Sequence, residues 1–295
     1  MLAKIYPVRR LLPLLLLLSW AGLSPALSKG QTASSALTPP QAQALVESAL
    51  ATELRTAQDP NHPMRYRLRK TSPRLTSTKE IVETRDGDIA RLVAIFDKPL
   101  SPADEQREQA RLDALLSDPG LQRHRKQGED EDAVRVMKIL RALPQAFLYQ
   151  FAGSDTGPAA TVEKFTFRPN PEFNPPNFET QILTHMTGEL WIDAAHERVA
   201  RLEGHLQQDV DIGWGILGRL KKGGWIVIEQ ADVGAHQWRT VRFQMVMSGR
   251  VLFLSRNLDT LEEQTQFAPL PAGLDYRQAI QMLRAAPENT APAVR

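Results

Sequence analysis

The sequence predicts a mainly β (α+β) protein, in which one antiparallel sheet packs against an N-terminal helix and a helical insertion. Three observations lead to this class. From residue 146 onward, apolar and polar side chains alternate in several segments, as in strands with one solvated face. Turn sequences separate these segments. Apolar residues at helical spacing occur after residue 38 and within residues 101–143.

The first elements are a helix and a three-stranded meander. Thr38 followed by Pro39-Pro40 is typical of a helix N-terminus, and the helix is expected to stop near Asp59-Pro60, because proline does not fit a helix interior. Asp86-Gly87-Asp88 is a hairpin signal between segments rich in β-branched and aromatic residues. The predicted strands are residues 65–70, 77–85 and 88–97.

The helical insertion starts at Ser101, which has the pattern of a capping residue, and is interrupted at Asp118-Pro119-Gly120. The charged block 123–132 is predicted to be a solvated loop or a helix start. Residues 133–143 predict an amphipathic basic helix. Its apolar face either packs on the sheet or acts as a movable lid or membrane-surface contact. That face contains Val136, Met137, Ile139, Leu140 and Leu143, and the basic face contains Arg135, Lys138 and Arg141.

The second half of the chain is predicted to be almost wholly strands. After segments 147–152 and 161–168, a proline-rich loop holds Phe173 and Phe178, which either line a ligand or anchor the loop. Residues 186–193 and 198–206 predict a hairpin with one dry and one wet face. In the first strand Met186, Gly188, Leu190 and Ile192 share the dry face, and Thr187, Glu189, Trp191 and Asp193 share the wet face.

A further group of strands follows Gly223-Gly224. It consists of residues 225–230, 238–247 and 251–254, with a tight turn at Ser248-Gly249. The second of these strands places large side chains in a row, which form either the floor of an apolar cavity or ordinary core, since methionine adapts to both. These side chains are Val241, Phe243, Met245 and Met247.

This order of elements resembles the bacterial lipoprotein-carrier family, the LolA/LolB-like superfamily. The resemblance lies in residues 186–193, in 198–204, in Gly223-Gly224-Trp225 and in Trp238, and it covers residues 145–270. It implies a single curved antiparallel half-barrel sheet with helices on its concave side and a hollow that holds acyl chains. The charged insertion and the proline-rich loop depart from that pattern.

The first 28 residues read as a secretory signal peptide. Lys4, Arg9 and Arg10 precede a leucine-rich run that is too short to span a membrane, and small residues follow near Ser28. Without this leader the formal charge changes from +2 to −1, with 33 basic against 34 acidic side chains, which disfavours nucleic acid as a partner. The chain has no cysteine, which excludes a thiol nucleophile and a lipid-modified N-terminal cysteine.

No catalytic or metal-binding signature stands out. His196-Glu197 begins a zinc-protease-like string, but Ala200 stands where the second histidine belongs. Gly213 to Gly218 matches a dinucleotide fingerprint without the helix that such a site needs. We therefore expect no enzyme activity, no cofactor and no metal.

The expected function is a periplasmic, monomeric carrier of a lipid or acyl-chain ligand, such as a lipoprotein, with transient membrane-surface contact. Its hollow would be formed by Val241, Phe243, Met245 and Met247, with Val136, Met137 and Leu140 above. The alternatives are an interaction module that binds a partner protein through a strand edge or the proline-rich loop, and an envelope hydrolase. The expected organisation is a signal peptide (1–28), a flexible tether (29–38), one domain (39–286) with its helical insertion (101–143), and a disordered tail (287–295).

Overall fold

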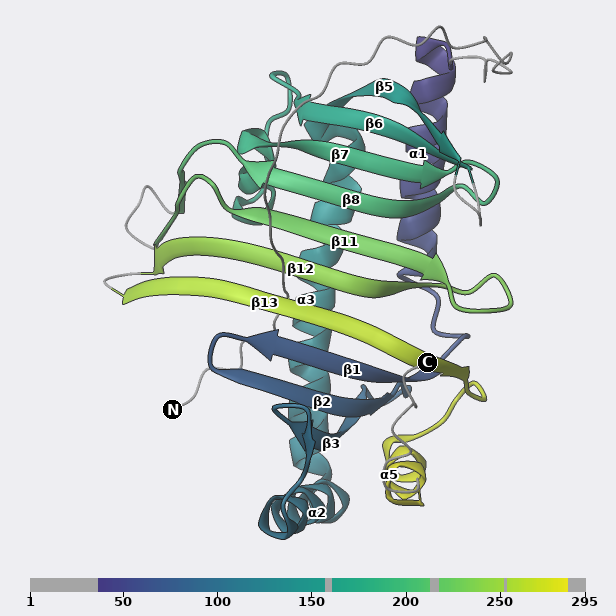
Figure 1. Ribbon diagram of the computed structural model, residues 1–295, viewed down its shortest axis with the longest axis vertical. Helices are drawn as coiled ribbons and strands as arrows, with labels where there is room; N and C mark the ends of the chain where they lie inside the picture. The colour runs from purple at the N-terminus through teal and green to yellow at the C-terminus, as the bar shows by residue number, and fades with distance from the viewer. Residues whose placement is uncertain (1–36, 157–160, 213–217, 252–253, 286–295) are drawn as a thin grey trace, which may run out of the picture.

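One open antiparallel sheet organises the protein, in agreement with the fold class expected from sequence (Figure 1). The computed structural model describes residues 37–156, 161–212, 218–251 and 254–285. The expected signal peptide, most of the tether, the tail and the greater part of the dinucleotide-like motif lie outside the described residues. The strands are β1 (Met64–Ser72), β2 (Leu75–Val82), β3 (Ile89–Ile95), β4 (Lys98–Pro99), β5 (Phe147–Thr156), β6 (Thr161–Pro169), β7 (Met186–Asp193), β8 (Arg198–Leu206), β9 (Val210–Ile212), β10 (Gly218–Leu220), β11 (Trp225–Asp232), β12 (Trp238–Val251) and β13 (Leu254–Pro269).

The strand order places the first and last strands of the chain beside each other. It runs β4-β3-β2-β1-β13-β12-β11-β8-β7-β6-β5, with β10 pairing to β12 and β9 to β10. The expected meander is confirmed as β1, β2 and β3, and β1 joins it to the second half of the sheet by pairing with β13. The sheet therefore consists of an N-terminal and a C-terminal part that meet in its middle.

Two helices cover the concave face of this sheet. The described helices are α1 (Pro39–Thr56), α2 (Pro102–Ser117), α3 (Pro119–Ala146), α4 (Phe178–Gln181), the 3₁₀ turn η1 (Ile182–His185) and α5 (Tyr276–Ala285). In Figure 1, α3 runs across the strands from the meander toward β5, α1 lies along the same face, and α2 and α5 lie at the end of the sheet near β3.

Helix α3 decides between the two predictions for the charged block, because residues 123–132 are helical. The break before it is real: α2 ends at Ser117, and the Asp118 side chain caps α3 by accepting a hydrogen bond from the Gly120 N–H at 2.8 Å. Opposite charges four residues apart then support the helix. These pairs are Arg125 with Glu129 and Lys126 with Asp130.

The expected turn at Ser248-Gly249 is wrong, because β12 continues through both residues to Val251. Gly249 pairs with Leu220 of β10 on one side and Arg256 of β13 on the other. A Cβ atom at Gly249 would lie 2.5 Å from the Arg219 carbonyl oxygen. The glycine permits the close approach of β10 and does not mark a turn.

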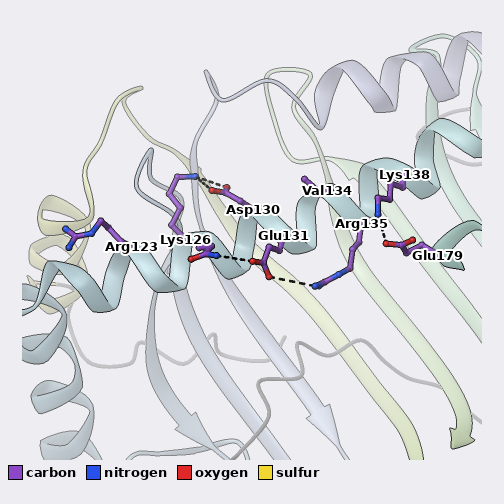
Figure 2. Close-up of a pocket in the computed structure, with 9 residues that line it drawn as sticks. Arg123, Lys126, Asp130, Glu131, Val134, Arg135, Lys138 and Glu179 are labelled. Carbon is purple, nitrogen blue, oxygen red and sulfur yellow. Dashed lines mark hydrogen bonds and ion pairs between the residues drawn. The ribbon is translucent and has the colours of Figure 1, made fainter. Parts of the chain in front are cut away.

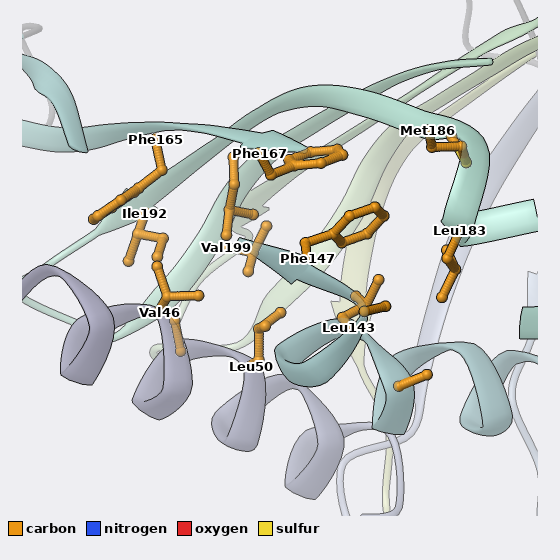
Figure 3. Packing of buried hydrophobic residues seen from close by; sticks show 14 of the residues in the cluster. Val46, Leu50, Leu143, Phe147, Phe165, Phe167, Leu183, Met186, Ile192 and Val199 are labelled. Carbon is orange, nitrogen blue, oxygen red and sulfur yellow. The ribbon is translucent and has the colours of Figure 1, made fainter. Parts of the chain in front are cut away.

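The larger hydrophobic core lies between the two covering helices and the β5 end of the sheet (Figure 3). Phe147 and Phe167 pack with ring centroids 4.4 Å apart. A Cβ atom at Gly188 would lie 1.8 Å from the Glu203 carbonyl oxygen, so only glycine fits beside β8. The labelled members in Figure 3 are Val46, Leu50, Leu143, Phe147, Phe165, Phe167, Leu183, Met186, Ile192 and Val199.

The dry face predicted for residues 186–193 is confirmed by the burial of Met186, Leu190 and Ile192. Asp193 was expected on the wet face, yet it is only 2% exposed. The register with β8 shifts between Trp191 and Ile192, so the strict alternation fails there. The Asp193 carboxylate instead accepts a hydrogen bond from the His196 N–H at 3.0 Å and organises the turn.

A second, smaller core lies at the opposite end of the sheet. It joins β2 and β3 to α2 and α5 through buried aliphatic residues. Between the two cores, α3 passes over β11, β12, β13 and β1 (Figure 1). This middle section holds the candidate site. The members of the smaller core include Val82, Ile89, Leu112, Leu115, Ile280 and Leu283.

Candidate functional site

A cavity of about 360 Å³ opens between α1, α3 and the concave face of the sheet. We call this cavity the hollow. Its surface is mainly apolar, although seven of its sixteen lining residues are polar or charged. The lining residues are Leu50, Glu53, Thr56 and Ala57 of α1, Val136, Leu140 and Leu143 of α3, Arg198, Val199 and Leu202 of β8, Ile228 and Gln230 of β11, Trp238, Arg239 and Thr240 of β12, and Glu83.

Helix α3 forms the cover of the hollow. Val136 lines the hollow and yet is 53% exposed, so solvent reaches the inner face of the helix at this point. Val134 is similarly exposed, at 56%, but it lies among the charged residues on the outer face of α3 (Figure 2). Residues two positions apart on a helix differ by about 200° in direction, which separates these two valines.

The predicted floor on β12 is only partly open. Phe243 lies directly opposite Ile228 and Met245 opposite Ile226, so these side chains share the face of the sheet that the helices cover. Phe243 and Met245 are half-buried, whereas Met247 is 5% exposed and belongs to the larger core.

The remaining predicted site residues are distributed between the hollow and its surroundings. Val241 is the extra residue of a β-bulge, because Glu229 pairs with Arg242 and Gln230 with Thr240. Val136 and Leu140 line the hollow, and half-buried Met137 lies outside its lining.

One end of the hollow holds a buried ion pair that sequence reasoning missed. The Arg198 guanidinium donates two hydrogen bonds to the Glu53 carboxylate, at 2.8 and 3.0 Å. The same carboxylate also accepts hydrogen bonds from the Val199 N–H at 3.1 Å and the Gln230 amide at 3.0 Å. A local signal existed, because Glu53 continues the apolar stripe of Val46, Ala49 and Leu50 on α1.

The other side of the covered face carries buried charges on β1, β2 and β13. The Lys70 ammonium lies 3.6 Å from the Glu262 carboxylate. Burial lowers the pKa of Lys70 to about 8 and raises the pKa of Glu262 to about 7. Burial also lowers the pKa of Lys79, which faces the same side.

The first half of α3 is held to the turn between β2 and β3. The Arg125 guanidinium donates to the Asp88 carbonyl oxygen at 2.9 Å, and the Glu129 carboxylate accepts from the Asp88 N–H at 3.0 Å. The Gln122 amide donates to the Asp86 carbonyl oxygen at 2.8 Å. Burial, with the neighbouring Glu83 and Glu129, raises the pKa of the Asp88 carboxyl to about 7.

Within the described residues, the histidines singled out from the sequence lie in turns and on the surface of the sheet. His196 lies in the β7–β8 turn, where its Nδ1 is 3.0 Å from the Asp193 carboxylate. Among the described residues, no three or more His, Cys, Asp or Glu side chains are arranged to hold a metal ion. Phe173 packs against the larger core, which fits an anchored loop, while Phe178 is 60% exposed.

None of the helices in the described part of the chain has the length and apolar character that a membrane span requires.

Two solved structures are similar to this chain. One is the structure of an outer membrane lipoprotein-sorting protein domain from Vibrio parahaemolyticus, with 11% identity, a TM-score of 0.29 and coverage of 81% of this chain and 99% of that one. The other is that of a LolA superfamily protein from Nitrosomonas europaea, with 8% identity, a TM-score of 0.27 and coverage of 78% and 94%. No family model and no curated protein matches the chain.

Proposed function

We propose that this protein is a non-enzymatic carrier that binds an acyl chain of a lipid or acylated protein in the hollow. The observation that carries the proposal is the cavity of about 360 Å³, whose surface is mainly apolar, with Val136 exposed at its opening. The expected signal peptide supports a location outside the cytoplasm. The protein would act in the periplasm after cleavage near Ser28, as a monomer whose single domain spans residues 39–286.

The binding mechanism is passive burial of the chain. Each methylene group transferred from water to the hollow would contribute about 0.8 kcal/mol. Leu140 and Leu202 supply aliphatic walls on the helix and sheet sides, and Phe243 extends the sheet surface beyond Ile228. The flexible Met245 beside it would adapt to chains of different shape. Release requires no chemical step, only transfer of the chain to another apolar surface.

Two valines on α3 provide a matched test. Val136→Asp places a carboxylate in the hollow, whereas Val134→Asp places the same group on the outer face of the helix at nearly equal exposure. We expect Val136→Asp to weaken the binding of a dansyl-labelled fatty acid about tenfold, because a charge must be desolvated against the chain. Val134→Asp should bind like the original protein. Equal affinities for the two variants would contradict binding in the hollow.

The natural ligand can be sought directly. The protein would be expressed in the bacterial envelope and purified without detergent, and native mass spectra would be recorded before and after organic extraction. An extractable acyl lipid at near one-to-one stoichiometry supports the carrier. A protein of the calculated mass that also fails to bind the labelled fatty acid would overturn it.

An interaction module is the second candidate, and the free edge of β5 favours it. This ten-residue edge strand pairs with β6, and Leu148, Gln150 and Ala152 point away from the core without any charge. Uncharged edges accept added strands readily. Cross-linking from position 148 to an envelope protein would support this candidate, and adding Gln150→Pro should abolish the cross-link.

A further inference from the structure

Side chains on neighbouring strands form a continuous row across the covered face. Leu202 of β8 lies opposite Ile228 of β11, which lies opposite Phe243 of β12. Phe243 in turn lies opposite Glu262 of β13, and Glu262 opposite Lys70 of β1. Directly paired residues point to the same face of a sheet, so the row changes from apolar to charged under α3.

The length of this row suits an extended acyl ligand. Four strand-to-strand steps separate Leu202 from Lys70, or about 19 Å along the sheet. Phe243, Glu262 and Lys70 are all half-buried, so solvent reaches the charged end of the row. In one of its two possible directions, a chain that lies on Leu202, Ile228 and Phe243 has its polar end beside Lys70.

The charges at this end do not balance. Glu262 lies near both Lys70 and Lys79, and Lys79 also lies near Glu108 and the cations Arg111 and Arg125. Lys79 forms no ion pair within 4 Å among the described residues. Lys79 belongs to this face because it lies opposite Leu68, two residues before Lys70 on β1.

The helices that approach Lys79 do not supply a spare negative charge. Glu108 of α2 is paired with Arg111, and Glu129 of α3 with Arg125. Burial lowers the pKa of both Lys70 and Lys79, which is the effect expected where ammonium groups lose water without gaining enough counter-charge. An anion would supply that counter-charge.

At the opposite end of the hollow, the charges of Arg198 and Glu53 are already paired. The Arg198 guanidinium donates to both oxygens of the Glu53 carboxylate, which accepts two more hydrogen bonds from the Val199 N–H and the Gln230 amide. A ligand head group placed there would have to compete with a complete ion pair.

We infer that the ligand carries an anionic head group, a carboxylate or phosphate, which binds at Lys70 and Lys79 while its acyl chain extends over Phe243 into the hollow. This inference rests on the proposed function and adds the class and direction of the ligand. It also assigns Glu262 a selective role, because its charge disfavours the same anion.

Displacement of a dansyl-labelled fatty acid at pH 7 tests the inference with three ligands below their micellar concentrations. Palmitate presents a carboxylate, palmitoyl-lysophosphatidylglycerol a phosphate, and hexadecyltrimethylammonium a cation. We expect one or both anions to bind at least about tenfold more tightly than the cation. The tighter of the two anions identifies the source of the head group.

Substitutions of opposite sign sharpen the test. Lys79→Gln should weaken anion binding about tenfold and leave the cation unchanged, whereas Glu262→Gln should strengthen anion binding. Lys79 is chosen because its removal breaks no ion pair. The control is Lys164→Gln, on the opposite face of the sheet beside Trp191. It should change the affinity of neither the anions nor the cation. A thermal melt of each variant checks its folding.

The outcomes separate the two proposals. If none of the three ligands displaces the labelled fatty acid and that probe itself does not bind, the carrier function fails. If all three bind alike and Lys79→Gln changes none of them, the carrier function stands and the anionic head-group site is overturned.

Discussion

The two sides of the covered face use charge in opposite ways. Near α1, the Arg198 and Glu53 side chains are about 8% and 11% exposed and form a bidentate pair with two additional hydrogen bonds to the carboxylate. Near the meander, Lys70 and Glu262 are 22% and 16% exposed and lie 3.6 Å apart, with Lys79 close by and unpaired within 4 Å among the described residues.

This difference indicates which side is structural. A buried pair with good geometry offsets much of the energy lost on removing two charges from water, and it fixes α1 against β8. The partly solvated charges of Lys70, Lys79 and Glu262 stabilise the fold less. They include an ammonium group that can still bind an anion. We therefore assign the α1 side to folding and the meander side to recognition.

Breaking the complete pair should have the largest effect on stability. Arg198→Ala leaves the Glu53 carboxylate buried without its counter-ion, and we expect a loss of about 3–5 kcal/mol in the free energy of unfolding. Urea denaturation followed by circular dichroism measures this loss. The control is Arg219→Ala, which removes the exposed partner of Asp211 and should leave the urea midpoint unchanged. A small loss for Arg198→Ala would mean that the pair is not structural.

The second-largest expected effect is the pH dependence of stability that the buried Asp88 carboxyl causes. Burial raises the pKa of Asp88 from 3.8 to about 7, so the folded protein binds a proton that the unfolded chain releases. The free energy of unfolding that this group contributes therefore falls as the pH rises from about 4 to 7. Above pH 7 the buried carboxylate destabilises the folded protein by its full amount. Asp88→Asn removes the ionisation. We expect it to stabilise the protein by on the order of 3 kcal/mol at pH 8 and by much less at pH 4.

Urea denaturation across this pH range gives the required curve for Asp88→Asn. Asp130→Asn is the control, since Asp130 is exposed and paired with Lys126 on the outer face of α3. It should show no gain that grows with pH. A pH-independent gain for Asp88→Asn would show that the carboxyl is not buried as the structure places it.

The sequence predicted much of the fold because its elements carry local signals. The alternation of apolar and polar residues predicted the dry face of β7. The helical spacing of apolar residues predicted α1 and the second half of α3. The helix over the charged block could also have been predicted, because oppositely charged side chains recur four residues apart between residues 125 and 130.

The candidate site was harder to predict because it depends on contacts distant in sequence. Glu53 and Arg198 are separated by 145 positions, and no local pattern pairs them. The bulge at Val241 changes which side chains share a face, and the sequence around it alternates as if no bulge were present. Met247 and Phe243 looked equivalent on one strand, yet one lies in the core and the other is partly open.

The smallest expected effect tests how α3 is held over the charged side. Gly87 has a φ of +95°, and a Cβ atom there would lie 2.5 Å from the Glu129 Oε2 atom. Gly273 has a φ of +79° and open space around its Cβ position. Alanine should destabilise at both positions through backbone strain, by about 1 kcal/mol. Gly87→Ala should lose about 1 kcal/mol more, because it displaces Glu129 from the Asp88 N–H.

Hydrogen exchange locates this additional loss. In Gly87→Ala, amides of residues 119–130 should exchange faster than in Gly273→Ala, while those of residues 139–146, which pack in the larger core, should keep their protection. Equal losses and equal exchange in the two variants would show that the turn between β2 and β3 does not hold the helix. The cover of the charged side would then depend on the core at the far end of α3 alone.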